Sequence, residues 1–140
     1  LMWANGWEGV DLWRDSANSI APTLVGGSKK HGGPDLGPTR AKKAWATLRV
    51  DGLGIWDECP GRNFVGMPRL TTRMAARIQG FPDDWMFVGR KTAAYRQIGN
   101  AFPPPVAAAI GTSIATALGV KAPANKQFEE SVERHLRAVS

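Results

Sequence analysis

Basic side chains gather in a glycine-rich stretch of this sequence, from Ser28 to Lys43. Five cations stand there against the single acid Asp35. Lysine, arginine and histidine supply N–H donors for phosphates and base edges. The net charge of +6 and the pI near 10.0 also favour an anionic partner, of which nucleic acid is the commonest. A generically basic surface is the open alternative. The candidate nucleic-acid contacts are Ser28, Lys29, Lys30, His31, Arg40, Lys42 and Lys43.

The stretch that holds the first of these cations is predicted to be a loop. Residues 26–38 contain five glycines and two prolines, which excludes a helix or a strand interior. Glycines allow a backbone to come close to a ligand, and a loop this long in a compact domain is usually functional or disordered. A solvated surface loop is the alternative.

Chemistry that depends on a cysteine nucleophile or on a bound metal is disfavoured. The single cysteine, Cys59, excludes an internal disulfide, and no basic residue precedes it closely to activate its thiol. The two histidines, His31 and His135, are too far apart in sequence to suggest a local metal pair. No metal site is expected, and a reducing, cytoplasmic setting is the default.

A second pair of basic residues, Arg73 and Arg77, is spaced four apart on a predicted helix over 72–79. Thr71 is its expected N-cap, and Gly80 its expected stop. Two arginines on one face of a short helix either bind an anion or brace the neighbouring loops. The buried stripe of this helix is expected to be Met74, Ala75 and Ile78.

The other elements that must position these residues are short. Thr39 and Thr92 are expected to cap two of the helices. On the first helix, Lys42 and Lys43 are expected on the exposed side and Trp45 inward. The sequence predicts a strand at Ile20–Val25 and helices at Arg40–Leu48, Ala93–Ile98 and Pro105–Leu118.

The apolar-rich run Phe102–Val120 has the length of a membrane span, at 19 residues. Prolines, glycines and hydroxyl residues interrupt it, and no anchoring residues flank it. We therefore expect a core helix in a soluble protein without a signal peptide.

Two blocks of this sequence resemble the signature motifs of the DNA cytosine-5 methyltransferases. Residues 69–84, RLTTRMAARIQGFPDD, look like the ninth motif of that family, and residues 95–106, YRQIGNAFPPPV, look like its tenth. The match spans about forty residues, with both patterns in the right order and at the right separation. Thr72 stands where the family usually has proline, and Met74 where it usually has glutamate, so the capping box is expected to be lost.

Other motifs of the family are absent from this sequence. These are the phenylalanine-and-glycine loop that helps to hold S-adenosylmethionine, the Pro-Cys pair with the nucleophile, the Glu-Asn-Val block and an arginine pair. Cys59 precedes its proline and does not match the nucleophile motif. The resemblance therefore implies the C-terminal portion of such an enzyme, catalytically silent by itself.

The resemblance also implies roles for single residues. The tenth motif lines the cofactor pocket in the family, which assigns Gly99, Asn100 and Ala101 to S-adenosylmethionine, with Tyr95 and Gln97 nearby. Asn100 has the donor and acceptor that a methionyl end would need, although a helix C-cap is a competing role. The ninth-motif helix organises the recognition domain, so Arg73 and Arg77 would give structural support.

The resemblance implies a mixed α+β, loop-rich fold. A small recognition domain with short strands and helices is followed by a C-terminal helix that belongs to a missing catalytic α/β domain. Residues 1–90 would be the target recognition domain, residues 91–120 the tenth motif and the completing helix, and residues 121–140 a polar tail that could form an amphipathic helix.

Two hypotheses follow for the function. In the first, the chain is a fragment or subunit of a bacterial restriction-modification type methyltransferase. It would bind double-stranded DNA, pair with the catalytic half of the enzyme, and help to bind S-adenosylmethionine. In the second, it is a stand-alone DNA-binding module without catalysis. A neighbouring polypeptide with the Pro-Cys and glycine-loop motifs would favour the first.

Overall fold

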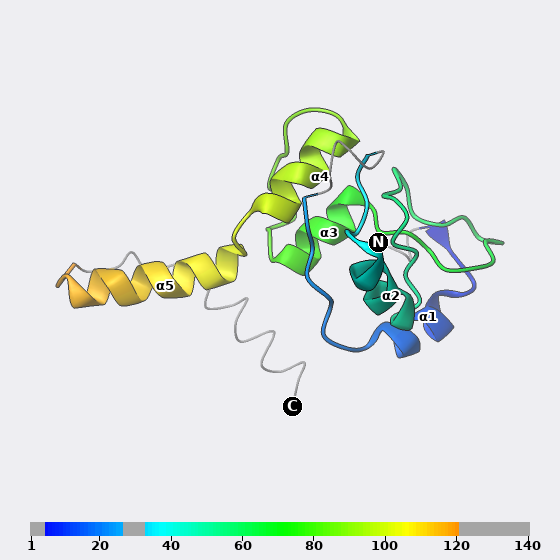
Figure 1. Ribbon diagram of the computed structural model, residues 1–140, viewed down its shortest axis with the longest axis horizontal. Coiled ribbons are helices and arrows are strands. Elements are labelled where there is room, and N and C mark those ends of the chain that lie inside the picture. The colour runs from blue at the N-terminus through cyan, green and yellow to red at the C-terminus, as the bar shows by residue number, and fades with distance from the viewer. Residues whose placement is uncertain (1–4, 27–32, 121–140) are drawn as a thin grey trace. The chain divides into compact units, whose positions relative to one another are not determined.

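The computed structural model describes residues 5–26 and 33–120, and the chain divides into two compact units, Leu1–Ala101 and Phe102–Ser140. Among the described residues, four helices belong to the first unit and one to the second (Figure 1). The helices are α1 (Val10–Ala17), α2 (Thr39–Thr47), α3 (Thr72–Gln79), α4 (Lys91–Asn100) and α5 (Pro104–Ala117).

Long loops connect the helices, and the part of the chain that the structure describes contains no strand. An isolated parallel bridge between Trp56 and Thr71 is the nearest approach to a sheet. The strand predicted at Ile20–Val25 is wrong, because this segment runs as irregular backbone. Pro22 has no N–H group to give to a ladder, and the end of the segment packs against a helix instead. The expected mixed α+β class is therefore corrected to helices and loops.

The core of the first unit is built around α3 and α4, which pack side by side (Figure 1). Ala75 and Ala76 on α3 are fully buried, and their small side chains allow the two helices to approach closely. Tyr95 and Ile98 on α4 are also fully buried. Loop residues and one residue each of α1 and α2 pack with them: Trp7, Val10, Leu24, Leu36, Trp45, Val50, Ile55 and Leu70.

Helix α3 has the predicted bounds and the predicted caps. Thr71 Oγ1 accepts a hydrogen bond from the Met74 N–H at 3.2 Å, and Gly80 ends the helix in the left-handed conformation with φ 88°. The expected loss of the capping box is wrong, since the Thr71 N–H donates to Met74 Sδ at 3.4 Å. A thioether sulfur is a weak acceptor, and it occupies the place of the usual carboxylate.

The buried stripe of α3 differs from the prediction at one residue. Met74 and Ala75 are buried as expected, whereas Ile78 is 41% exposed and Ala76 is buried in its place. Because α3 has only eight residues, Ile78 falls in its last turn, beyond the part of the helix that the core covers.

The helices α2, α4 and α5 begin earlier than predicted. Thr39 is the first residue of α2 and not its cap, because the extended Pro38 occupies the N-cap position. Helix α4 begins at Lys91 after Arg90, so Thr92 does not cap it either. In the second unit, α5 begins at Pro104. Proline is tolerated there because the first turn of a helix does not use its backbone N–H groups.

Helix α2 ends in an unusual way at Arg49. The N–H of Val50 bonds to the carbonyl of Trp45, and the N–H of Arg49 bonds to that of Ala46, which is a Schellman motif. Arg49 has φ 54° and is the one non-glycine residue with positive φ among those described. The left-handed conformation costs a residue with a Cβ atom roughly 1–2 kcal/mol.

The second unit is described up to Val120, and its described part consists mainly of α5. None of the residues of this helix is buried, although most of them are apolar. Within the described ranges, no helix is both long enough and apolar enough to span a bilayer. The amphipathic helix predicted in the tail at 121–140 lies outside the described residues.

Candidate functional site

Two glycines allow the segment that leads into the basic loop to cross directly over the end of α4. A Cβ atom added at Gly99 would lie 2.6 Å from the backbone nitrogen of Gly26 and 2.6 Å from the carbonyl carbon of Val25. Real Cβ atoms do not approach backbone this closely, so only glycine fits at residue 99. A Cβ atom added at Gly26 would collide with the side-chain amide of Asn100. The two backbones therefore touch, with the Asn100 amide beside Gly26.

The three residues predicted to face a cofactor lie at this crossing and differ in what they offer. Gly99 packs against the backbone of Val25 and Gly26. The carbonyl of Ala101 accepts a hydrogen bond from Gln79 Nε2 at 2.7 Å. Asn100 is exposed, and its amide makes no hydrogen bond with any residue in the described ranges. Among the described residues, the donor and acceptor of Asn100 therefore have no partner, and its side chain does not cap α4.

Two further residues of α4, expected near the cofactor, lie in different surroundings. Tyr95 is fully buried, and burial together with the charge of Asp35 raises the pKa of its hydroxyl. Gln97 Nε2 donates to the carbonyl of Val88 at 2.7 Å and to that of Ala93 at 3.2 Å. Tyr95 is packed in the core and its hydroxyl has no partner among the described residues, whereas Gln97 is exposed and its amide N–H groups are bonded to these two carbonyls.

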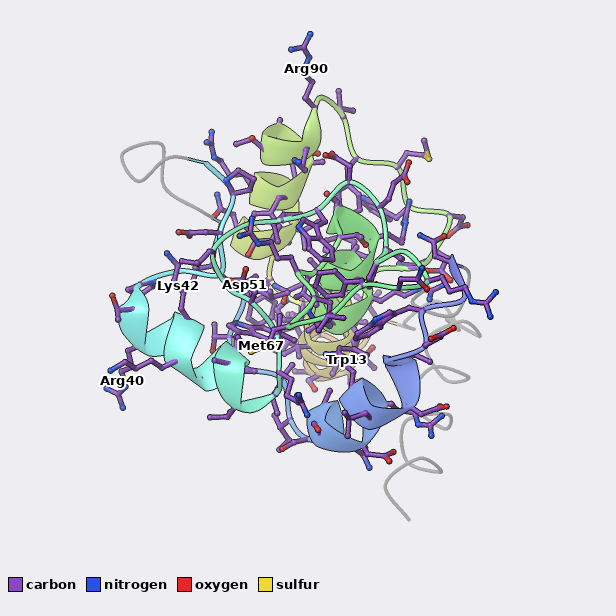
Figure 2. All side chains as sticks on the ribbon, turned by 90° about the vertical axis from the view of Figure 1, so that its right-hand side faces the viewer. Trp13, Arg40, Lys42, Asp51, Met67 and Arg90 are labelled. Carbon is purple, nitrogen blue, oxygen red and sulfur yellow. The ribbon has the colours of Figure 1, made fainter. Side chains whose placement is uncertain are left out.

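The candidate DNA contacts are only partly described. Ser28, Lys29, Lys30 and His31 lie outside the described residues. Arg40 and Lys43 are exposed on α2, and their spacing of three places them on one face of that helix. Neither makes a hydrogen bond or ion pair within the described part of the chain. Figure 2 shows Arg40 pointing away from the protein.

Lys42 differs from its two neighbours, and the expectation that it lies on the exposed side is wrong. Its Nζ forms an ion pair with Asp35 at 2.6 Å, and 28% of its side chain is exposed. A Cβ atom added at Gly52 would lie 3.0 Å from Lys42 Cγ, so the stem of the lysine covers that glycine. Figure 2 shows Arg40 and Lys42 on opposite sides of α2. The charge of Lys42 is therefore neutralised within the protein.

An ion pair anchors the loop that follows α2. Arg69 Nε donates to Asp51 Oδ2 at 2.7 Å, and the Leu53 N–H donates to Asp51 Oδ1 at 2.9 Å. Burial raises the pKa of Asp51, but these two hydrogen bonds and the charges of Arg69 and Lys42 outweigh it, so the pKa lies below its ordinary value. Asp51 is therefore held in its ionised form.

Both arginines of α3 contact the loop that follows the helix. Arg77 donates twice to the carboxylate of Asp83, with Nε at 2.6 Å and Nη2 at 2.5 Å. This bidentate hydrogen bonding raises the pKa of Arg77 and lowers that of Asp83. Arg73 Nη1 donates to the carbonyl of Trp85 at 3.2 Å, and its guanidinium lies 6.0 Å from the ring centre of Phe87. These contacts suit a bracing role better than an anion site.

Cys59 lines an open cavity of about 420 Å³ together with residues of α3, α4 and the loop at 86–87. The cations there are already engaged, since Lys91 pairs with Asp57 at 2.7 Å and Arg73 contacts the loop. In the described ranges, no group of three or more potential metal ligands comes together.

Sequence reasoning missed two kinds of residue at this site. Gly26 was treated only as part of a loop, although a glycine pair directly after an apolar segment can indicate a close backbone approach. Gln79 belongs to the ninth motif, but its bond to the Ala101 carbonyl joins it to the tenth. No local pattern shows that contact, because 22 residues separate the two partners.

The chain matches the family model described as C-5 cytosine-specific DNA methylase over residues 28–116, which is more than half of its length. It is 62% identical over 124 residues to the type II methyltransferase M.NaeI of Lentzea aerocolonigenes, covering 86% of this chain and 30% of that protein. It is 52% identical over 121 residues to the type II methyltransferase M.NgoMIV of Neisseria gonorrhoeae, covering 84% of this chain and 38% of that protein.

A plant enzyme shares a shorter region. DNA (cytosine-5)-methyltransferase 1B of Oryza sativa subsp. japonica is 48% identical over 52 residues, which are 37% of this chain and 3% of that protein. No solved structure matches the chain. The chain thus spans about a third of the length of the two bacterial relatives, at 30% and 38%. Because the family model covers most of its residues, this chain belongs to the C-5 cytosine-specific DNA methylase family.

Proposed function

We propose that this chain supplies DNA contacts and one wall of the S-adenosylmethionine pocket in a DNA cytosine-5 methyltransferase. The observation that carries the proposal is the crossing of Val25 and Gly26 over Gly99 and Asn100. The segment that enters the basic loop touches the residues that match the cofactor motif. A ligand at Asn100 and a DNA duplex at the loop would therefore be bound by adjoining parts of one unit.

The cofactor side of the proposal depends on Asn100. Its amide is exposed and unpaired within the described residues, and it offers both a donor and an acceptor. The methionyl carboxylate and ammonium groups of S-adenosylmethionine need such partners. When bound, S-adenosylmethionine would supply the methyl group. Gly99 leaves no side chain between the amide and the crossing segment, and the rest of the pocket would come from the motifs that this sequence lacks.

The DNA side of the proposal depends on the exposed cations of α2. Arg40 and Lys43 are unpaired in the described ranges and would contact phosphates, which position a protein on DNA. Residues 28–31 would read base edges in the major groove. Chemistry at cytosine C5 also requires the base to leave the duplex. Lys42, whose charge is paired with Asp35, would contribute least.

Catalysis itself would need a second part of the enzyme. The resemblance implies that a cysteine thiolate attacks cytosine C6 so that C5 becomes nucleophilic, and this chain has no Pro-Cys pair. The apolar helix α5, none of whose residues is buried, would pack against that catalytic half. Arg73 and Arg77 would support the recognition unit from within, through their contacts to the loop after α3.

Complementation tests this proposal directly. The 140-residue chain alone should transfer no methyl group to DNA, whereas addition of the part of M.NaeI that the chain does not cover should restore transfer. In the restored enzyme, Asn100→Ala should raise the dissociation constant for S-adenosylmethionine about tenfold, as expected for loss of one or two hydrogen bonds. Asn63→Ala, at an exposed asparagine of another loop, is the matched control.

Each part of the proposal has an outcome that contradicts it. Sustained turnover by the chain alone would refute the fragment assignment. DNA binding that is never accompanied by methyl transfer, even after complementation, would support the stand-alone DNA-binding module instead. An unchanged cofactor affinity in Asn100→Ala would remove Asn100 from the pocket.

A further inference from the structure

We infer that Arg49, at the end of α2, is a DNA-phosphate contact in addition to Arg40 and Lys43. The inference rests on the proposed DNA-binding function and assigns it a residue outside the stretch that the sequence singled out. It is argued from the backbone of Arg49, from its side chain, and from the charges around it.

The backbone of Arg49 is in a conformation that glycine adopts far more readily. Arg49 occupies the residue of the Schellman motif that is usually glycine, with φ 54°. A glycine there would make both backbone hydrogen bonds without steric conflict. The presence of arginine therefore lowers the stability of the fold. Local rules of this kind are most often broken at functional sites.

The side chain of Arg49 does nothing for the fold that would explain its presence. It is exposed, and no described residue forms a hydrogen bond or ion pair with it. The acids that flank α2 in sequence are already bound, since Asp35 pairs with Lys42 at 2.6 Å and Asp51 pairs with Arg69 at 2.7 Å. The guanidinium of Arg49 is therefore available to an anion from outside this part of the protein.

The charges around Arg49 suit an extended polyanion. Residues 36–50 contain four cations and no acid. Arg40 lies in the first turn of α2, where the helix dipole disfavours a positive charge. At 1.5 Å and about 100° per residue, Arg49 lies roughly 13 Å from Arg40 along the helix and about half a turn round it. Phosphates follow one another about every 3.4 Å along the axis of one DNA strand, so Arg40 and Arg49 would contact different phosphates.

Three variants of the 140-residue chain test this inference, with thermal unfolding and binding to a 20-base-pair DNA duplex as readouts. Arg49→Gly should raise the midpoint of thermal unfolding by about 4 °C. The same variant should bind DNA more weakly and reduce the slope of log K against log salt concentration by about 0.9, the loss of one phosphate contact. Arg49→Lys should leave the slope unchanged. Arg49→Ala should reduce the slope as Arg49→Gly does, without raising the midpoint of thermal unfolding.

The outcomes separate this inference from the proposed function. If Arg40→Ala and Lys43→Ala reduce the slope while Arg49→Gly leaves it unchanged, the inference is overturned and the proposed DNA binding stands. If the wild-type chain shows no salt-dependent binding, both are overturned. A lower unfolding midpoint for Arg49→Gly would show that the arginine stabilises the fold, which also overturns the inference.

Discussion

Replacing Gly99 by alanine tests whether the backbone crossing at the end of α4 exists as described. In an open helix the substitution would stabilise the protein, because alanine has the higher helix propensity, by about 0.5–1 kcal/mol. Here the added Cβ atom would lie 2.6 Å from Gly26 N, 2.6 Å from Val25 C and 2.7 Å from Gly26 Cα. The structure therefore predicts the opposite sign.

The size of the destabilisation by Gly99→Ala follows from those three distances. Carbon atoms in contact are normally about 3.5–4.0 Å apart, so the segment at Val25 and Gly26 must move by about 1 Å. All three contacted atoms belong to the backbone, and no rotamer change can relieve the overlap. Overpacking of this kind costs about 1–3 kcal/mol. After the helical gain is subtracted, Gly99→Ala should destabilise the first unit by about 1–2 kcal/mol.

Urea unfolding followed by tryptophan fluorescence would measure this change. Gly61→Ala is the control, because nothing lies within 4 Å of a Cβ atom added at Gly61, and its effect should stay within about 0.5 kcal/mol. Gly26→Ala should be milder than Gly99→Ala, because its new atom meets the Asn100 side chain, which can rotate away. If Gly99→Ala were as stable as the wild type or more stable, the close contact of Gly99 with Val25 and Gly26 would be contradicted.

Three other predictions follow from the contacts of the first unit. Thr71→Ala should lower the free energy of unfolding by about 1 kcal/mol through loss of the N-cap bond, while Thr72→Ala should change it much less in the same urea titration. Lys43→Ala should reduce the slope of log K for DNA binding against log salt concentration by about 0.9, with little change in stability. Lys42→Ala should mainly reduce stability, because the ion pair with Asp35 and the packing of the lysine stem on Gly52 are lost. Since the pKa of Asp51 is lowered on folding, its ion pair stabilises the fold above pH 3.8, and this contribution is lost as the pH falls below that value. Asp51→Asn should therefore flatten the dependence of unfolding free energy on pH in this range. An unchanged dependence would contradict the ion pair with Arg69.

Elements with strong local signals were predicted well. Helix α3 was predicted to the residue, because Thr71 and Gly80 mark its ends through hydrogen bonds and backbone conformations that involve only near neighbours in sequence. The prediction of a strand at Ile20–Val25 was wrong. Leu24 of this segment is buried in the core and Val25 contacts α4, and neither contact requires a neighbouring strand.

Side-chain environments were harder to predict than elements. Lys42 and Lys43 are adjacent and of one type, yet the first is paired and half-buried while the second is exposed. The difference depends on Asp35 and Gly52, which come from two separate loops. Local periodicity gives the direction of a side chain on its own helix but does not show which loop covers it.

The sequence by itself determined the family, the approximate positions of α2 to α5 and the excess of positive charge, because motifs, caps and composition are local properties of the chain. The tertiary structure decided which residues are free to act. Packing brings Gly26 into contact with Gly99, although more than seventy residues separate them. It pairs Lys42 with Asp35 and Asp51 with Arg69, and it leaves Asn100 and Arg49 exposed. The physical reason is that backbone contact, burial and charge pairing depend on distances in space, which only the packing of distant segments sets.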